Sequence, residues 1–96
     1  MVNNILNLGY GNVIMKDKVV AILNINSAPI KKMISEARVN NLLYDVSQGR
    51  KSRSVVITTN HQVYLTAIKI ETMTNRMLND NFDVVDDKEE DLEDEE

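Results

Sequence analysis

The apolar segments of this 96-residue chain are short, and this limits what it can fold into. The longest unbroken apolar run covers residues 19–23, far below the roughly 20 residues that cross a bilayer. The β-branched run at residues 19–25 is too short for an independent helix and predicts a central strand. No Pro/Gly/Ser-rich linker divides the chain, so we expect one folded domain, soluble and cytoplasmic, without a membrane partner.

Further strands are expected on the same grounds. They fall at residues 2–8, 13–15, 42–46, 55–57 and 62–69. Gly9 and Gly11 separate the first two and permit a bend between them. Residues 62–69 alternate with a period of two, and the turn at residues 60–61 predicts a hairpin with the strand before it.

Two helices are predicted from spacing and capping. Ser27 is expected to cap the amino end of the first helix, with Pro29 in its first turn, where a missing N–H costs nothing. Its apolar stripe consists of Ile30, Met33, Ile34 and Ala37. The second, shorter helix is indicated by the spacing of Ile70, Met73, Met77 and Leu78. The fold class is therefore α+β, a small antiparallel sheet with two helices.

The size of the folded part favours self-association. A domain of this length buries only about 60% of its unfolded surface, and an open sheet leaves its edge strands unpaired. With one phenylalanine and no tryptophan, the core is modest. We therefore expect a homo-oligomer.

Charge is distributed unevenly along the chain. Residues 83–96 carry ten acidic side chains and one basic one, a net charge of −9, whereas residues 1–82 carry ten basic and five acidic side chains, a net charge of +5. The basic body suggests a polyanionic partner, although the whole chain is acidic. The tail at 83–96 is expected to be disordered, because like charges repel and few apolar groups offset the ordering entropy. Both a solubility role and electrostatic competition for the basic body remain open.

No residue constellation indicates catalysis or metal binding. The chain has no cysteine, which excludes disulfides and thiolate zinc sites, and its single histidine, His61, falls in a predicted turn. The acidic residues of the body are scattered, and Gly9 and Gly11 lack the third glycine and following helix of a dinucleotide loop. We expect no enzyme activity, no cofactor and no metal.

A basic segment between two predicted strands is the strongest candidate for function. Arg50, Lys51 and Arg53 occupy three of four positions, with no acidic residue in the segment to offset their repulsion. In an extended run Lys51 and Arg53 would point together and Arg50 away, whereas a bend at Gly49 would turn all three to one side. Arginine binds phosphate oxygens in bidentate fashion. The segment predicts polyanion binding, with a solvated loop as the simpler alternative.

Two basic pairs are weaker candidates. Lys16 and Lys18 precede the strand at residues 19–25, and Lys31 and Lys32 lie in the first turn of the first helix. Cations at a helix N-terminus oppose the macrodipole, so helix stability does not account for the second pair. An anion site there is one interpretation. Coverage of apolar surface by a lysine stem is the other.

These motifs together resemble a known family. They are residues 6–12 (Leu-Asn-Leu-Gly-Tyr-Gly-Asn), 27–34 (Ser-Ala-Pro-Ile-Lys-Lys-Met-Ile), 36–38 (Glu-Ala-Arg), 49–57 (Gly-Arg-Lys-Ser-Arg-Ser-Val-Val-Ile) and 71–72 (Glu-Thr). Over about residues 4–78 the sequence resembles the RemA-type extracellular-matrix regulators, small bacterial DNA-binding proteins. The Ser-Ala-Pro-Ile-Lys block followed at this distance by the Gly-Arg-basic-polar-Arg block is the specific part of the pattern.

The resemblance implies a transcriptional regulator of extracellular matrix and biofilm whose protomers form a homo-oligomeric ring, with a basic outer rim gripping double-stranded DNA. It assigns DNA contacts to Lys18, Arg50 and Lys51, with Arg53 completing the motif. Lys18 and Lys51 stand where arginine is common in the family, so charge is kept but the planar fork is lost. Residues 1–82 then form the DNA-binding domain, and the acidic tail lies outside the matched region.

Two other functions stay open on sequence alone. An RNA-binding module would use the sheet and the basic segment, although Tyr10, Tyr44 and Tyr64 are not expected to cluster as a stacking platform requires. A non-catalytic protein-interaction or structural oligomer would pair the basic segment with an acidic partner or with the chain's own tail.

Overall fold

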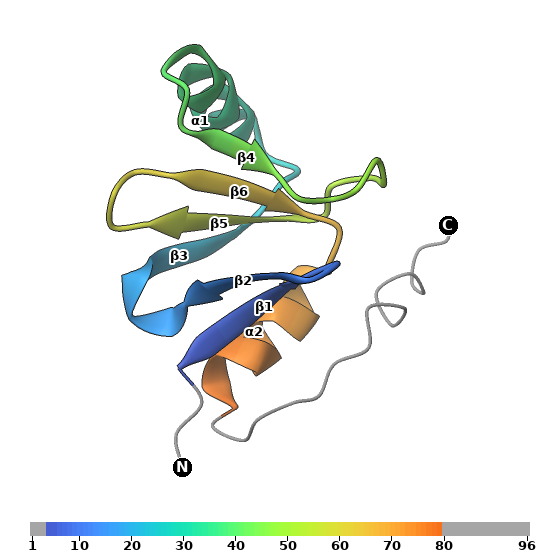
Figure 1. Cartoon of the computed structure of the whole chain (residues 1–96). Helices are drawn as coiled ribbons and strands as arrows, with labels where there is room; N and C mark the ends of the chain where they lie inside the picture. Colours follow the sequence, from blue (N-terminus) through green and yellow to red (C-terminus); the bar gives the residue numbers. More distant parts are fainter. Residues whose placement is uncertain (1–3, 80–96) are drawn as a thin grey trace.

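The computed structural model describes residues 4–79. Its elements are β1 (Ile5–Gly9), β2 (Asn12–Met15), the 3-10 helix η1 (Lys16–Lys18), β3 (Val19–Asn24), α1 (Ala28–Val39), β4 (Leu43–Asp45), β5 (Ser54–Thr58), β6 (Val63–Thr66) and α2 (Ile70–Leu78). The predicted α+β class and both helices are confirmed (Figure 1). The predicted acidic tail at residues 83–96 lies outside the described residues.

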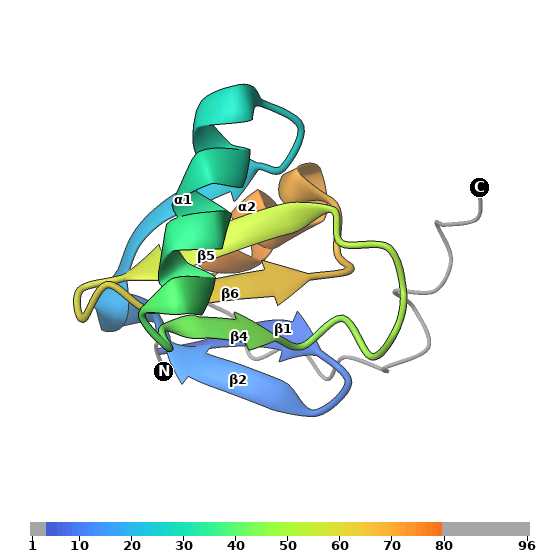
Figure 2. The same cartoon turned by 90° about the horizontal axis from the view of Figure 1, so that it is seen from above.

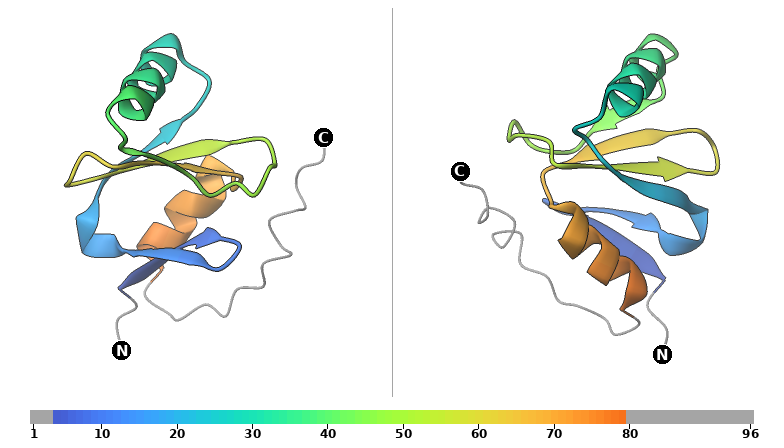
Figure 3. Two further views of the ribbon diagram at one scale, coloured as in Figure 1. Left: turned by 45° about the horizontal axis from the view of Figure 1, so that its top comes forward. Right: turned by 180° about the vertical axis from the view of Figure 1, so that it is seen from behind.

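The elements form three layers around one four-stranded sheet. On one face, α1 packs through Ile34 and Ala37 onto a buried cluster that includes Val55 and Leu65. On the other face, the β1–β2 hairpin and α2 cover a second cluster (Figure 3). That cluster consists of Leu6, Leu8, Val56, Ile68 and Met73. Because side chains alternate across a strand, Val55 and Val56 of β5 pack on opposite faces, and so do Val63 and Tyr64 of β6.

The order of strands in the sheet is β3-β5-β6-β4. The prediction that residues 19–25 form a central strand is wrong, because β3 lies at an edge. Its long apolar run reflects layers on both faces of the sheet rather than strands on both sides. The pairing with β5 shifts register between Val19 and Ala21, and Val20 at this irregularity is 62% exposed. Such an irregularity makes an edge strand a poorer template for further pairing.

The sheet is mixed, not wholly antiparallel as predicted. β5 pairs antiparallel with both β3 and β6, which confirms the predicted hairpin, but β4 pairs parallel with β6. A separate two-stranded sheet joins β1 and β2. Its turn contains Gly9 (φ 97°) and Gly11 (φ 83°), so the predicted bend is confirmed. The hydrophobic pattern predicted the strands, although β6 ends at Thr66 and not at residue 69, and it carries no information on which strand β4 would select as its neighbour.

The helix ends follow the capping signals. The Ile30 N–H donates to Ser27 Oγ (3.4 Å) at the start of α1, and Pro29 stands in its first turn, as predicted. In α2, Met73 is buried, but Leu78 is 75% exposed, which corrects its placement on the inward face. Arg76 is buried instead, and its Nη1 donates to the Asn7 carbonyl (3.0 Å).

Neither helix within residues 4–79 is long and apolar enough to span a membrane.

Candidate nucleic-acid interface

The basic segment is a crossover loop that is fixed at both ends to one strand. The Val46 N–H donates to the Leu65 carbonyl (2.9 Å), and the Arg53 N–H donates to the Thr66 carbonyl (2.7 Å). Leu65 and Thr66 are neighbours in β6, so the loop passes over the end of β6 on its way from β4 to β5. In Figure 2 this segment projects at one end of the sheet. We call residues 46–53 the basic loop.

A tight turn sets the shape of the basic loop. The Arg50 N–H donates to the Ser47 carbonyl (3.0 Å), and the two central residues, Gln48 (φ 57°) and Gly49 (φ 79°), both have positive φ. Positive φ at both central positions is the pattern of a type I′ turn. Nothing lies within 4 Å of the position that a Cβ on Gly49 would occupy, so the glycine is needed here for its backbone conformation and not for space.

A carboxylate holds the start of this turn. One oxygen of Asp45, Oδ1, accepts hydrogen bonds from both the N–H (2.9 Å) and the hydroxyl (2.6 Å) of Ser47. Ser47 is only 1% exposed, so its polar groups depend on this acceptor. The sequence reading missed this role, although an aspartate two residues before a serine is a common local turn signal. Asp45 thus orders the loop from outside it.

The predicted phosphate-binding residues of the loop fall into two groups. Lys51 and Arg53 line the same cavity, whereas Arg50 does not line it. This agrees with the extended alternative, in which Lys51 and Arg53 point together. Arg50 and Lys51 are exposed, whereas Arg53 is half-buried, and its backbone N–H extends the pairing of β5 with β6. The loop therefore presents cations on the surface and inside a recess.

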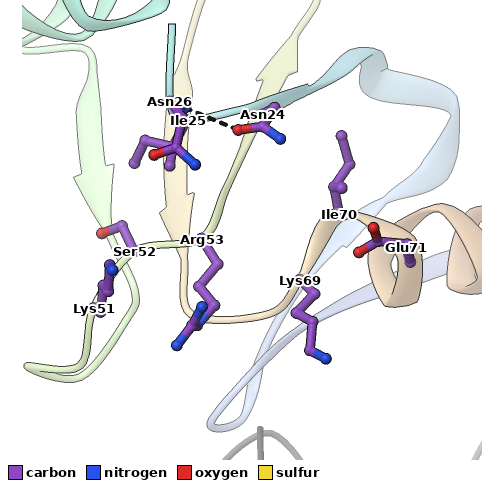
Figure 4. A pocket seen from close by; sticks show the side chains of 9 residues that line it. All are labelled: Asn24, Ile25, Asn26, Lys51, Ser52, Arg53, Lys69, Ile70 and Glu71. Carbon is purple, nitrogen blue, oxygen red and sulfur yellow. Dashed lines mark hydrogen bonds between the residues drawn. The ribbon is translucent and has the colours of Figure 1, made fainter. Parts of the chain in front are cut away.

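The recess is a cavity of about 170 Å³ between the end of β3, the basic loop and the start of α2 (Figure 4). Its lining residues are Asn24, Ile25, Asn26, Lys51, Ser52, Arg53, Lys69, Ile70 and Glu71. Lys69 and the two asparagines were missed by the sequence reading. No local signal in the sequence associates them with the basic loop, because only the path of β6 brings the start of α2 beside it.

Lys18 lies at the opposite end of the sheet from the basic loop. In the β3–β5 pair, Val19 is opposite Thr58 and Asn24 is opposite Ser54, so the strand separates Lys18 from Arg53. Five strand residues at about 3.4 Å each place these ends roughly 17 Å apart. η1, which contains Lys18, and the basic loop are at opposite sides of Figure 1. One protomer does not bring the four predicted contact residues into a single cluster.

Comparison with known proteins gives the family. A model of the RemA-like family, described as extracellular matrix regulatory protein A-like, matches residues 5–77. The chain belongs to the RemA-like family. It is 43% identical over 93 residues to a protein of Thermoanaerobacter sp. (strain X514), with 96% of each chain covered. It is 40% identical over 80 residues to one of Thermotoga neapolitana, covering 83% of this chain and 87% of the relative. A Nostoc sp. (strain PCC 7120) relative is 45% identical over 74 residues, covering 77% and 84%. The names of all three begin with the words "Putative regulatory protein".

The remaining basic residues of this RemA-like protein serve different purposes. Lys16 Nζ donates to the Asn79 carbonyl (2.7 Å), which ties η1 to the end of α2. Arg76 is likewise committed to the interior through Asn7. Lys31 and Lys32 are exposed in the first turn of α1, as predicted, and neither lines the cavity. Fewer basic side chains are therefore available to a partner than the ten counted in residues 1–82. They are most concentrated in and beside the basic loop.

The histidine and the possible metal ligands are the remaining candidate groups in this RemA-like protein. His61 is exposed in the β5–β6 turn with φ 66°. Among residues 4–79, no group of three histidine, cysteine, aspartate or glutamate side chains is arranged to hold a metal ion.

Two tyrosines do cluster, which corrects the sequence reading. Parallel pairing of β4 with β6 places Tyr44 directly opposite Tyr64, and their rings stack with centroids 5.2 Å apart and planes 24° from parallel. Burial, and then the neighbouring Tyr44, raise the pKa of Tyr64 above its ordinary value of 10.0. Tyr64 packs against the buried cluster under β1, while Tyr44 is 40% exposed.

Proposed function

We propose that this RemA-like protein is a DNA-binding regulator of transcription that acts as a homo-oligomeric ring and contacts backbone phosphates of double-stranded DNA. The contacts are Lys18, Arg50, Lys51 and Arg53. The observation that carries the proposal is the basic loop, which holds three cations on a backbone fixed at both ends to β6. Because the backbone of this loop is already ordered, its cationic donors can bind a ligand without the entropy cost of ordering the loop.

Self-association is supported by surfaces that the described part of the chain leaves uncovered. The four-stranded sheet ends in β4 on one side, and within residues 4–79 no further strand pairs with the outer edge of β4. The outward face of the β1–β2 hairpin exposes Ile5, Val13 and Met15, between 40% and 53% each. Exposed apolar surface beside open sheet edges is typical of interfaces between protomers.

The proposed mechanism is avidity. If each protomer neutralises about two to four phosphates, a single protomer binds DNA weakly. A ring that presents several protomers along a bent duplex binds far more tightly without new kinds of contact. Phosphate contacts position the protein but carry no base information. Sequence preference then comes from repeats phased to the helical turn and from DNA deformability.

Salt-dependent DNA binding tests this function. Arg50→Ala and Lys51→Ala should weaken binding and each reduce the slope of log K against log salt by about one for every protomer engaged. Arg38→Gln, at an exposed position in the last turn of α1, is a matched control for loss of one charge. Light scattering on each variant establishes that the oligomer is unchanged. Parent-like affinity and slope in both alanine variants would refute the assignment of the loop to DNA.

The stacked tyrosines give the RNA alternative one supporting observation, because aromatic rings bind unstacked bases. Competition between duplex DNA and single-stranded RNA for the same protein separates the two. Preference for RNA, lost in Tyr44→Ala, would replace DNA as the partner.

The interaction-module alternative is tested by deleting residues 83–96. If the acidic tail competes for the basic loop, the deletion tightens DNA binding well beyond the gain expected from lost repulsion. A shortened protein that forms oligomers but still ignores duplex DNA would favour a structural role.

A further inference from the structure

The cavity beside the basic loop combines donors from segments that are distant in the sequence. Lys51 and Arg53 come from the basic loop, and Lys69 comes from the residue that precedes α2. Asn24 and Asn26 line the wall formed by the end of β3. The Oδ1 of Asn24 accepts from the Asn26 N–H (2.9 Å), which leaves the Asn24 side-chain amide nitrogen as a further donor. Figure 4 shows these side chains around one recess.

The charge of the cavity favours an anion. Among residues 4–79, three cationic side chains and one carboxylate, that of Glu71, line it. Lys69 occupies the N-cap position of α2 without a side-chain capping bond, and a cation at that position opposes the helix macrodipole. Helix stability therefore does not account for Lys69. A negatively charged group in the cavity does account for it, because this group would be stabilised both by the lysine and by the positive end of α2.

The size of the cavity limits the ligand. Pockets for drug-sized molecules and cofactors measure about 300–1,000 Å³, whereas this cavity measures about 170 Å³. The space suits a single tetrahedral oxyanion and not a whole nucleotide or cofactor. We propose that the cavity seats one phosphate group of the DNA backbone and that Lys69 is a contact residue alongside Lys51 and Arg53. This inference rests on the proposed DNA-binding function and adds a defined phosphate position to it.

Opposite charge changes at two residues that line the cavity from the start of α2 test the proposal. Lys69→Gln in the full-length oligomer should weaken binding uniformly across duplex sequences and lower the salt slope by about one per engaged protomer. Glu71→Gln removes the carboxylate that lines the cavity from α2 and should tighten binding. Arg38→Gln again controls for net charge. Because Lys69→Gln removes an unfavourable helix charge, its thermal stability should be no lower than that of the parent, which separates lost contact from lost fold.

The outcomes distinguish this inference from the function it rests on. If Arg50→Ala weakens binding but Lys69→Gln and Glu71→Gln leave it unchanged, the cavity assignment is wrong and the DNA function stands. If none of the three changes binding, the assignment of the basic loop to DNA fails together with the cavity, and a parent protein that does not bind duplex DNA at all overturns the DNA function itself. A thermal-shift titration with inorganic phosphate at constant ionic strength covers the other source of the anion. Phosphate that stabilises the parent but not Lys69→Gln, while both bind DNA equally, would assign the cavity to free phosphate and overturn the DNA-phosphate proposal.

Discussion

Removing the carboxylate that orders the basic loop should lower stability and DNA binding together. Asp45 Oδ1 accepts from both the N–H and the hydroxyl of Ser47, and Ser47 is 1% exposed. Asp45→Ala leaves two nearly buried donors without their acceptor, at a cost of about 1–3 kcal/mol. For a domain of 60–100 residues, each kcal/mol lowers the melting temperature by about 4–8 °C. We therefore expect the midpoint to fall by on the order of 10 °C.

The matched variant is Asp45→Asn, which keeps an oxygen acceptor at the same position but removes the charge. Its stability loss should be well below that of Asp45→Ala. Each variant removes a negative charge next to the basic loop, so charge alone would make both variants bind DNA more tightly than the parent. Only Asp45→Ala disorders the turn, so we expect it to bind DNA more weakly than Asp45→Asn.

The assays are thermal and urea unfolding followed by circular dichroism at one fixed protomer concentration, because oligomerisation makes both midpoints depend on concentration. DNA affinity is measured by anisotropy on the same samples. An Asp45→Ala protein with the parent's urea midpoint would refute the role assigned to this carboxylate. Equal DNA affinity of the alanine and asparagine variants would refute the link between turn order and binding.

Three other predictions concern the core and the two basic ends. Arg76→Met should cost about 1–3 kcal/mol in urea unfolding by leaving the Asn7 carbonyl without its donor, while the salt slope of DNA binding stays unchanged. The pKa of Tyr64 is raised in the folded state, so its contribution to stability is complete below pH 10.0, the ordinary value. This contribution is lost as the pH rises from there through the higher folded pKa. In urea unfolding at alkaline pH, Tyr64→Phe should therefore lose less stability than the parent. Lys18→Ala and Arg50→Ala should have additive effects on DNA-binding free energy, within about 0.5 kcal/mol, because sites beyond about 10 Å act independently; a larger coupling energy in the double variant would contradict their separation.

The elements of the fold could be predicted from sequence because each has a local cause. The Ser27 cap, the Pro29 position and the apolar stripe define α1 within a short window. Period-two alternation likewise predicts β6, and the glycine pair predicts the β1–β2 turn. Each of these signals lies within a few residues, where backbone sterics and side-chain direction act.

Pairing between strands could not be predicted in the same way. The placement of β3 at an edge and the parallel register of β4 with β6 depend on contacts between distant segments. An apolar run shows that two faces are covered, but it does not show which strands lie on either side. The missed stacking of Tyr44 on Tyr64 follows directly, because it requires the parallel register.

The candidate site shows the same division. Arg50, Lys51 and Arg53 could be selected from local charge and turn residues, and the structure places Lys51 and Arg53 together. The contribution of Lys69 depends on the path that β6 takes into α2, which no local pattern contains. Lys16 illustrates the converse, since a lysine that looks available in the sequence is bonded to the end of α2.

The way the basic loop is fixed has a consequence for how a duplex would be selected under the proposed function. Both ends of the loop bond to adjacent residues of β6, and the chain that leaves β6 leads directly to Lys69. The segments that carry the cations around the cavity therefore share one strand as the support of their backbone. A phosphate contact on such a support gains affinity because little backbone freedom remains to be lost. Because the protein backbone does not adjust, the DNA must bend to meet it, and the energy cost of that bending depends on the DNA sequence. A rigid protein surface with few base contacts can in this way still discriminate between promoters.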